Sequence, residues 1–360
     1  MAVLDRVTEL INKNITGDQK LSICMIVKDE EANIGPCIEA FKECADEFCI
    51  VDTGSTDRTL EIIETNRISG LEIQVEQHVW EPNFSKFRNI SLEMASHSWI
   101  LWIDADDRAD KQTIQKLNAI KKTGLTKRKA YLLPIINYVK GKPNQKFAQL
   151  RVFPNSHGIK FEGKIHENVN ASLEKHDFKT YVLSDAPIKH LGYDVSPEIL
   201  KEKRQRNYEI LMTELDNTST YYYLGGYYRS MQNPYYAMSC YTQVLIRDNV
   251  SKAMREKSKL MIGECFESLS IYDKAIEWYS NSEDSDANFR IAECYLLQGN
   301  VLEAKIHYEM YINEPSGVSY MGDNRETYEA LAYAQLISLS EKEFQHWTGE
   351  HADFMFSKNK

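Results

Sequence analysis

Asp104, Asp106 and Asp107 place three carboxylates within four residues, directly after the apolar run Trp99–Ile103. A run of this length is typical of a strand buried on both faces of a parallel sheet. Carboxylates two residues apart at the end of such a strand can converge on one cation, and hard oxygen ligands suit Mg²⁺ or Mn²⁺. A solvated acidic turn that caps the next helix explains a lone Asp-x-Asp equally well, so the elements around it must decide.

The composition is that of an ordinary globular chain and argues against several classes of protein. The 360 residues are 42% hydrophobic and 27% charged, and the net charge of −10 argues against nucleic acid as the main partner. Seven cysteines without CxxC spacing indicate neither a zinc site nor a disulfide framework, and they favour a reducing compartment. Because no apolar run approaches the ~18–20 residues of a membrane span, we expect a cytoplasmic protein without a transmembrane segment.

Strand and helix patterns alternate through the first hundred residues. Short apolar strands are expected at 21–27, 48–51, 71–75 and 99–103, each followed by a polar loop or helix start. This alternation predicts a doubly wound, Rossmann-like α/β domain with a mostly parallel sheet. Glu30, Asp52, Arg88 and Asp104 all follow strands, and ligands of open α/β sheets bind beyond the carboxyl ends of the strands. The sequence therefore predicts one site at that edge.

Four blocks in this order resemble family 2 glycosyltransferases of the GT-A fold. The blocks are IVKDEE at 26–31, VDTGSTDRT at 51–59, FSKFRN at 84–89 and DAD at 104–106. The likeness is greatest to a bacterial subgroup that carries a C-terminal tetratricopeptide region and includes the sublancin-type peptide S-glycosyltransferases. FEGKIHE at 161–167 and APIKHLGY at 186–193 extend the resemblance to about residue 215. Asp29, where family members often carry Asn, is a mild departure.

The resemblance implies a role for each block. Asp52 would hydrogen-bond the nucleotide base, and Glu30 would help line the nucleoside pocket. Asp104 and Asp106 would bind Mn²⁺ or Mg²⁺ together with the donor diphosphate. The nucleotide-sugar as a whole would contact Val27, Glu30, Asp52, Arg88 and Asp104.

An inverting transferase needs a base that takes the acceptor proton. We expect Glu167 to be that base, with His166 as the alternative because imidazole titrates near neutrality. A structural pair of His166 and Glu167 is a third possibility. His190, before a Gly-Tyr turn, is expected as a further metal ligand or a diphosphate contact, and a structural histidine is nearly as well supported.

A basic helix is expected after Pro197, with Lys201, Lys203, Arg204 and Arg206 along it. Its basic face could contact the diphosphate or the acceptor. A solvated helix face is the favoured interpretation, because charged runs on helices usually face water.

The second half of the chain carries three matches to the tetratricopeptide pattern. In each, a small residue is followed by an aromatic residue three positions on, by alanine twelve on and by a second aromatic sixteen on. The small residues are Gly225, Gly263 and Ala292. We therefore expect a GT-A domain over 1–215 and an all-α, TPR-like repeat domain over 216–360. Such a stack offers a surface for a peptide, a protein or a second copy of the chain.

These features together predict an inverting, metal-dependent glycosyltransferase. It would move a sugar from a nucleotide-diphosphate sugar, a UDP-sugar on resemblance alone, to a peptide, protein or cell-surface glycan acceptor. One alternative is a repeat scaffold whose transferase domain has lost activity. A second is a nucleotidyltransferase, against which the lack of a Gly-rich, basic triphosphate loop after the first strand argues.

Overall fold

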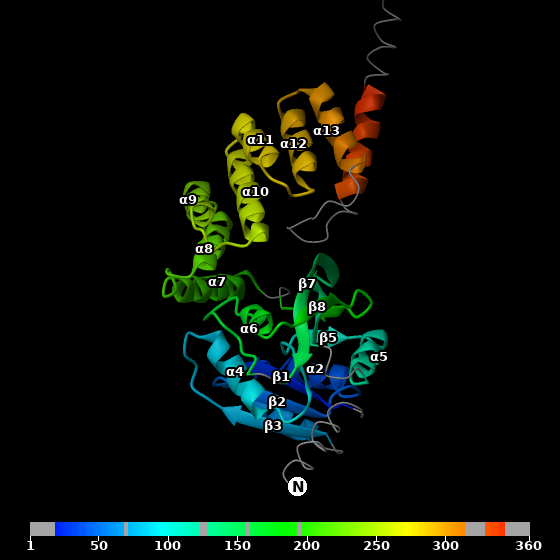
Figure 1. The fold of residues 1–360 in the computed structure, drawn as a ribbon, viewed down its shortest axis with the longest axis vertical. Coiled ribbons are helices and arrows are strands. Elements are labelled where there is room, and N and C mark those ends of the chain that lie inside the picture. The colour runs from blue at the N-terminus through cyan, green and yellow to red at the C-terminus, as the bar shows by residue number, and fades with distance from the viewer. Residues whose placement is uncertain are drawn as a thin grey trace, which may run out of the picture. The chain divides into compact units, whose positions relative to one another are not determined.

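The structure is a computed structural model that describes residues 19–67, 71–122, 128–155, 158–192, 196–313 and 328–342. The chain divides into two compact units, Met1–Ile210 and Leu211–Lys360. The first is built on a mixed sheet and the second on helices, as Figure 1 shows.

Four parallel strands form one half of the sheet, in the order β3-β2-β1-β4. They are β1 (Leu21–Val27), β2 (Glu47–Asp52), β3 (Glu72–Gln77) and β4 (Trp99–Trp102). The helices between them are α2 (Ile34–Phe41), α3 (Thr59–Asn66) and α4 (Phe84–Met94). Val27 pairs with Asp52, so β1 and β2 end level with each other. The loops that follow them therefore meet at one edge, as the sequence predicts.

The other half of the sheet begins where β7 (Lys142–Pro154) pairs antiparallel with β4. It continues through β6 (Lys129–Val139), β9 (Ile188–His190) and β5 (Asp107–Ala109), while β8 (Lys179–Val182) also pairs with β6. The remaining helices of the unit are α5 (Lys111–Ile120), α6 (Asn170–Lys175) and most of α7 (Pro197–Leu211). Five of the eight pairings among the described strands are parallel, which confirms a mostly parallel α/β sheet.

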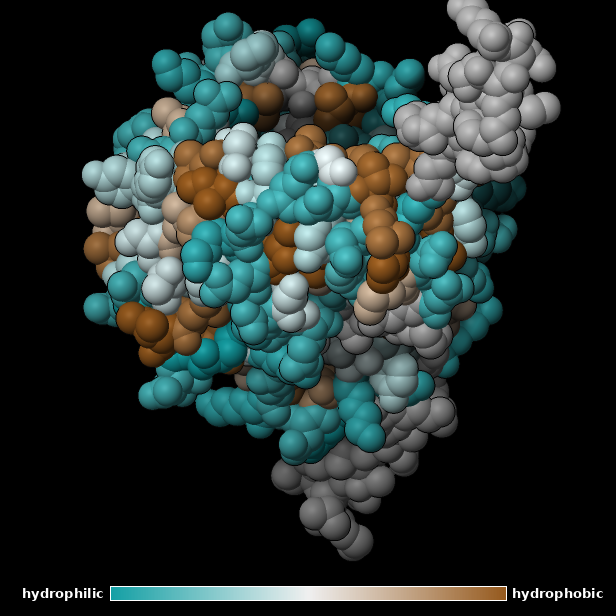
Figure 2. All heavy atoms as spheres, turned by 90° about the horizontal axis from the view of Figure 1, so that it is seen from above, coloured by the Kyte–Doolittle hydropathy of each residue, from teal (hydrophilic) through white to brown (hydrophobic). Residues whose placement is uncertain are grey.

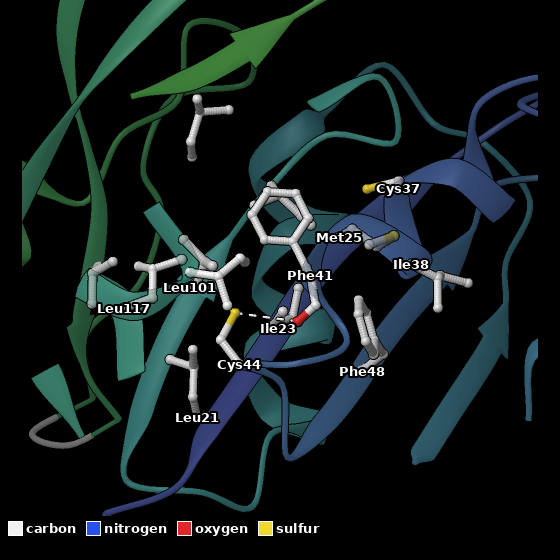
Figure 3. Packing of buried hydrophobic residues seen from close by; sticks show 14 of the residues in the cluster. Leu21, Ile23, Met25, Cys37, Ile38, Phe41, Cys44, Phe48, Leu101 and Leu117 are labelled. Carbon is white, nitrogen blue, oxygen red and sulfur yellow. Dashed lines mark hydrogen bonds between the residues drawn. The ribbon is translucent and has the colours of Figure 1, made fainter. Parts of the chain in front are cut away.

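Both faces of the central strands are buried. Ile23 and Met25 of β1 pack in the same cluster as Phe41 of α2, as Figure 3 shows, whereas Cys24 belongs to the cluster on the opposite face. Each fully buried apolar side chain of this size contributes about 1.5–3 kcal/mol to folding. Cys44 donates a hydrogen bond to the Phe41 carbonyl at 3.2 Å, and burial raises the pKa of the Cys44 thiol to about 12. These are packing cysteines, and all seven are free.

Helical hairpins build the second unit. Its helices are α8 (Thr218–Ser230), α9 (Pro234–Leu245), α10 (Lys252–Ser268), α11 (Tyr272–Ser280), α12 (Ala287–Leu297) and α13 (Val301–Asn313). A further helix spans 328–342. Each helix packs against the next along the chain, which is the arrangement of helical repeats.

The small residues of the repeat pattern lie where two helices cross. A methyl group on Gly225 would lie 2.5 Å from the Tyr241 ring, and one on Gly263 would overlap the Tyr279 ring in the same way. Both tyrosines are buried, with 1% and 0% of their surface exposed. Glycine is therefore required for the close approach that lets the aromatic ring fill the space between helices, and the predicted TPR-like architecture is confirmed.

Apolar side chains also reach the surface of the helical unit, including Tyr235 of α9 and Leu302 of α13. Figure 2 shows brown apolar patches separated by teal hydrophilic side chains on the face in view. Among the helices that the structure describes, none has both the length and the apolar character of a membrane span.

Candidate active site

A cavity of about 650 Å³ opens at the carboxyl ends of β1, β2 and β4, within the first unit. Its walls come from the loops after these strands, from α4, from α7 and from the end of β9. Six of the residues predicted for the site line it: Val27, Glu30, Arg88, Asp104, Asp106 and His190. The sheet thus brings together residues that are up to 163 positions apart in the sequence (190 − 27).

The pairing of β5 with β9 builds the centre of the site. Asp107 lies opposite His190 in that antiparallel ladder, and the His190 Nδ1 is 2.9 Å from Asp107 Oδ1 and 3.2 Å from Asp106 Oδ1. Potential ligand atoms of Asp104, Asp106, Asp107 and His190 all lie within 4.8 Å of one another. Three carboxylates and an imidazole this close form a donor set for one divalent cation.

Two details fit a cation at Asp106. The Asp106 Oδ1 atom is buried and accepts no hydrogen bond from the described residues, although His190 Nδ1 lies 3.2 Å away, so this oxygen has coordination capacity to spare. A methyl group on Gly192 would press against Asp106 Oδ2 and lie 2.8 Å from His190 Nε2. Glycine thus lets these two candidate ligand atoms lie close to the backbone and to each other. Carboxylates with an imidazole suit Mn²⁺ well, and Mg²⁺ through its oxygen ligands.

The protonation equilibria show how much negative charge is gathered here. Burial, together with the nearby Asp104, Asp107 and Glu30, raises the pKa of Asp106 to about 7. For His190, burial alone would lower the pKa, but the hydrogen bond to Asp107 and the surrounding carboxylates raise it to about 9. Without a metal, the raised pKa values of Asp106 and His190 favour their protonated forms, which offset the negative charge of the cluster. A bound cation would offset that charge instead.

Arg88 of α4 connects the cluster to the cavity wall. Its Nε donates to Glu167 Oε1 at 2.5 Å, its Nη2 donates to Asp104 Oδ1 at 2.9 Å, and its guanidinium lies 4.3 Å from the Trp102 ring. Burial opposes the charge on Arg88, but the two carboxylates outweigh it and raise the pKa of the guanidinium. The Nη1 atom is buried and has no hydrogen-bond partner among the described residues, so an anionic ligand group would satisfy it.

Arg151 of β7 is a site residue that sequence reasoning missed. Its Nη1 donates to Asp107 Oδ2 at 3.0 Å, its Nη2 reaches Asp104 Oδ2 at 3.4 Å, and its guanidinium lies 3.8 Å from the Trp102 ring. Arg88 and Arg151 outweigh the effect of burial and hold the pKa of Asp104 well below its usual range. An arginine in the otherwise apolar end of a buried strand is the signal that could have pointed to it.

Three predicted site residues lie outside the lining of this cavity. Asp52, at the end of β2, accepts hydrogen bonds from the backbone N–H of Gly54 at 3.0 Å and of Ser55 at 3.1 Å, and so closes the following turn. Glu167 lines a separate cavity of about 170 Å³ and is paired with Arg88. His166 is exposed, and its backbone is left-handed with φ 53°.

The basic face of α7 lies at the cavity. Lys203, Arg204 and Arg206 line it, and Arg206 stands 5.1 Å from the Phe84 ring. Burial raises the pKa of Glu30, and the hydrogen bond from Asn33 and the charge of Lys203 oppose that shift. Lys201, Arg204 and Arg206 are exposed, as the favoured interpretation of a solvated face expects, and three of the four basic residues also border the cavity.

Comparison with known proteins identifies the first unit. Residues 22–175 match the model of the Glycosyl transferase family 2. The SPbeta prophage-derived glycosyltransferase SunS of Bacillus subtilis is 29% identical over 209 residues, which cover 56% of this chain and 47% of SunS. A TPR repeat-containing protein of Synechococcus elongatus is 28% identical over 180 residues, covering 48% of this chain and 42% of that protein. This chain thus spans about half the length of the curated relatives it matches.

Among solved structures, the mannosyltransferase PcManGT from Pyrobaculum calidifontis, in complex with GDP-Man and Mn²⁺, overlaps with a TM-score of 0.47 at 12% identity. The overlap covers 91% of this chain and 88% of that one. The similarity that identifies the domain is the family match over 22–175.

Proposed function

Because residues 22–175 form a Glycosyl transferase family 2 domain, we propose that this chain is an inverting glycosyltransferase that uses a divalent metal and a nucleotide-diphosphate sugar. The observation that carries the proposal is the arrangement of charged groups around this cavity. Asp104, Asp106 and His190 bring ligand atoms for a cation together, and Arg88 Nη1 is buried without a hydrogen-bond acceptor among the described residues. A metal-bound diphosphate would supply a cation to the first group and an oxygen acceptor to the second, and all four residues line one cavity.

Asp106 and His190 would hold the metal. Asp104 would lie beside it, with its carboxylate held by hydrogen bonds from Arg88 and Arg151. When bound, Mn²⁺ or Mg²⁺ offsets the charge that develops on the leaving diphosphate. Arg88 and the cations of α7, which line the same cavity, would add positive charge to that group. Val27 and Glu30 would line the nucleoside portion. On family resemblance we take a UDP-sugar as the donor, and Asp52 as the residue that reads its base.

Glu167 remains our proposed base, with His166 as the alternative. Glu167 Oε1 accepts a hydrogen bond from Arg88 Nε at 2.5 Å. In the proposed mechanism the donor draws Arg88 toward its diphosphate, which frees Glu167 Oε1 to face the acceptor. Substitution of Glu167 should then lower kcat far more than it raises the KM for the donor, whereas a role in holding Arg88 alone would appear mainly in KM.

The repeat unit would recruit the acceptor, which we propose to be a peptide or protein, with a cell-surface glycan as the other class. Helical repeats present extended surfaces for such partners or for a second copy of the chain. We place the protein in the cytoplasm, which the seven free cysteines support, and we propose no nucleic-acid partner.

The test is a donor screen with the purified full chain. Thermal unfolding and donor hydrolysis are followed with UDP-, GDP-, TDP- and CMP-sugars, in Mn²⁺ and in EDTA. One donor class should stabilise the protein only with the metal, by about 2.7 kcal/mol at a hundredfold excess over Kd. Asp106→Asn should abolish that shift. Asp110→Asn is the matched control, because Asp110 only caps α5 and asparagine caps a helix equally well.

No shift with any donor, from a protein that remains folded, would refute the proposal and favour the repeat scaffold. Release of pyrophosphate from a nucleoside triphosphate and a sugar phosphate would identify a nucleotidyltransferase instead.

A further inference from the structure

We infer that Asp107 is a positioning residue that orients His190 toward the metal, rather than a metal ligand itself, and that Arg151 holds Asp107 in place. This inference rests on the metal site of the proposed function. Of the four residues in the cluster, Asp106 and His190 would face the cation, Asp104 would lie beside it, and Asp107 lies behind His190.

The hydrogen bonds of Asp107 are the first argument. The residue is fully buried, with 0% of its surface exposed, and it is not part of the cavity lining. Its Oδ1 lies 2.9 Å from His190 Nδ1. Its Oδ2 accepts from Arg151 Nη1 at 3.0 Å and from the backbone N–H of Asp104 at 2.9 Å. Both oxygens are thus committed to protein groups, which leaves the carboxylate poorly placed to coordinate a cation.

The orientation of the imidazole is the second argument. Because Nδ1 is bonded to Asp107, the nitrogen of His190 that can coordinate a metal is Nε2. That nitrogen lies 2.8 Å from the point that a methyl group on Gly192 would occupy, and Asp106 Oδ2 borders the same point. Around protein-bound metals, a histidine that binds the metal through one ring nitrogen usually donates the N–H of the other to a carboxylate. The carboxylate then fixes both the tautomer and the ring angle.

Arg151 supplies the counter-charge that makes this arrangement possible. Only 2% of its surface is exposed, and its guanidinium stacks on Trp102, whose indole N–H donates to the Leu150 carbonyl at 2.7 Å. The arginine is thus fixed on a rigid strand. A buried carboxylate that loses its charged partner is strongly destabilising, so without Arg151 the position of Asp107, and with it the anchor of His190, would be lost.

A double-mutant cycle on Mn²⁺ binding tests the inference. The Kd for Mn²⁺ alone is measured by calorimetry for the unsubstituted chain, Asp106→Asn, Asp107→Asn, His190→Gln and the Asp107→Asn/His190→Gln double variant, with Asp110→Asn as the control. Each single site variant should weaken binding about 10–100-fold. The double variant should be within threefold of His190→Gln, because Asp107 acts through the histidine. The imidazole nitrogen coupling in the electron paramagnetic resonance spectrum of Mn²⁺ should weaken in Asp107→Asn.

Three results would overturn the inference. Losses that multiply in the double variant would make Asp107 a ligand in its own right. An Asp107→Asn variant that binds Mn²⁺ within threefold of the wild type would show that Asp107 does not position His190. If Asp106→Asn and His190→Gln still weaken binding in that case, the proposed metal site itself stands. Unchanged binding in those two variants, or no binding by the wild type, would overturn the metal site as well.

Unfolding of each variant is measured without metal. If Asp107→Asn does not fold, the same cycle is run on Asp107→Asn/Arg151→Met, which removes both buried charges together. The same expectations and the same contradicting results apply to it.

Discussion

Replacement of Gly192 by alanine should abolish metal binding and leave the fold intact. The added methyl group would press against Asp106 Oδ2 and lie 2.8 Å from His190 Nε2, at a point that borders both atoms. Bonds from Mn²⁺ or Mg²⁺ to oxygen or nitrogen measure about 2.0–2.2 Å. The methyl group would displace both side chains by more than these bond lengths tolerate.

The magnitude follows from the two contacts. Loss of the geometry at Asp106 and His190 together should weaken Mn²⁺ binding at least about 100-fold, which corresponds to about 2.8 kcal/mol. The cost to folding should stay near 1 kcal/mol, at the low end of overpacking, because both atoms are ends of side chains that border an open cavity. The backbone at Gly192 is not left-handed, so alanine adds no conformational strain.

Calorimetric titration with Mn²⁺ and thermal unfolding in EDTA measure the two effects separately. Gly226→Ala is the matched control, because an added methyl group there meets nothing within 4 Å. A Gly192→Ala protein that binds Mn²⁺ within threefold of the wild type would refute the assignment of Asp106 and His190 as ligands. A variant that does not fold would show instead that Asp106 and His190 cannot move aside.

Further predictions concern stability, measured by denaturant unfolding. Gly225→Ala should destabilise the protein by about 1–3 kcal/mol, because the methyl group would lie 2.5 Å from the buried Tyr241 ring. Gly226→Ala should instead raise the free energy of unfolding by up to about 1 kcal/mol, because its methyl group meets nothing within 4 Å. Equal effects of the two substitutions would contradict the repeat packing. Glu47→Gln should cost about 1–3 kcal/mol, because this buried carboxylate accepts hydrogen bonds from Ser22 and Ser96. Burial alone would raise the pKa of Glu47, but these hydrogen bonds outweigh burial and lower the pKa. The difference in unfolding free energy between Glu47→Gln and the wild type should therefore shrink as the pH falls below about 4.5. A difference that stays constant with pH would contradict this.

Much of the fold could be predicted from local pattern. The apolar runs of β1, β2 and β4 identify strands buried on both faces, and the alternation with α2, α3 and α4 identifies a parallel sheet. Asn83 accepts a hydrogen bond from the Lys86 backbone N–H at the start of α4, as helix-capping residues do. The twelve-residue and sixteen-residue offsets of the repeat pattern correspond to contacts between paired helices, such as the one between Gly225 and Tyr241.

Parts of the site were less accessible to sequence reasoning. Asp107 and Arg151 have no motif of their own, and their importance appears only where buried charges meet. The basic residues of α7 look like an ordinary solvated helix face in the sequence, because helical periodicity does not say what lies opposite. Glu167 is a predicted site residue, but its hydrogen bond to Arg88 joins residues 79 positions apart and could not be inferred from the sequence.

The sequence by itself determined which residues end the strands, and therefore that Glu30, Arg88, Asp104 and Asp106 would meet at one edge of the sheet. This follows because parallel strands align their carboxyl ends whatever the details of packing. Only the tertiary structure decided that β9 pairs antiparallel with β5 and so sets His190 opposite Asp107. That pairing depends on long-range register, which short-range periodicity does not encode, and it brings an imidazole to the acidic turn where we propose that a cation binds.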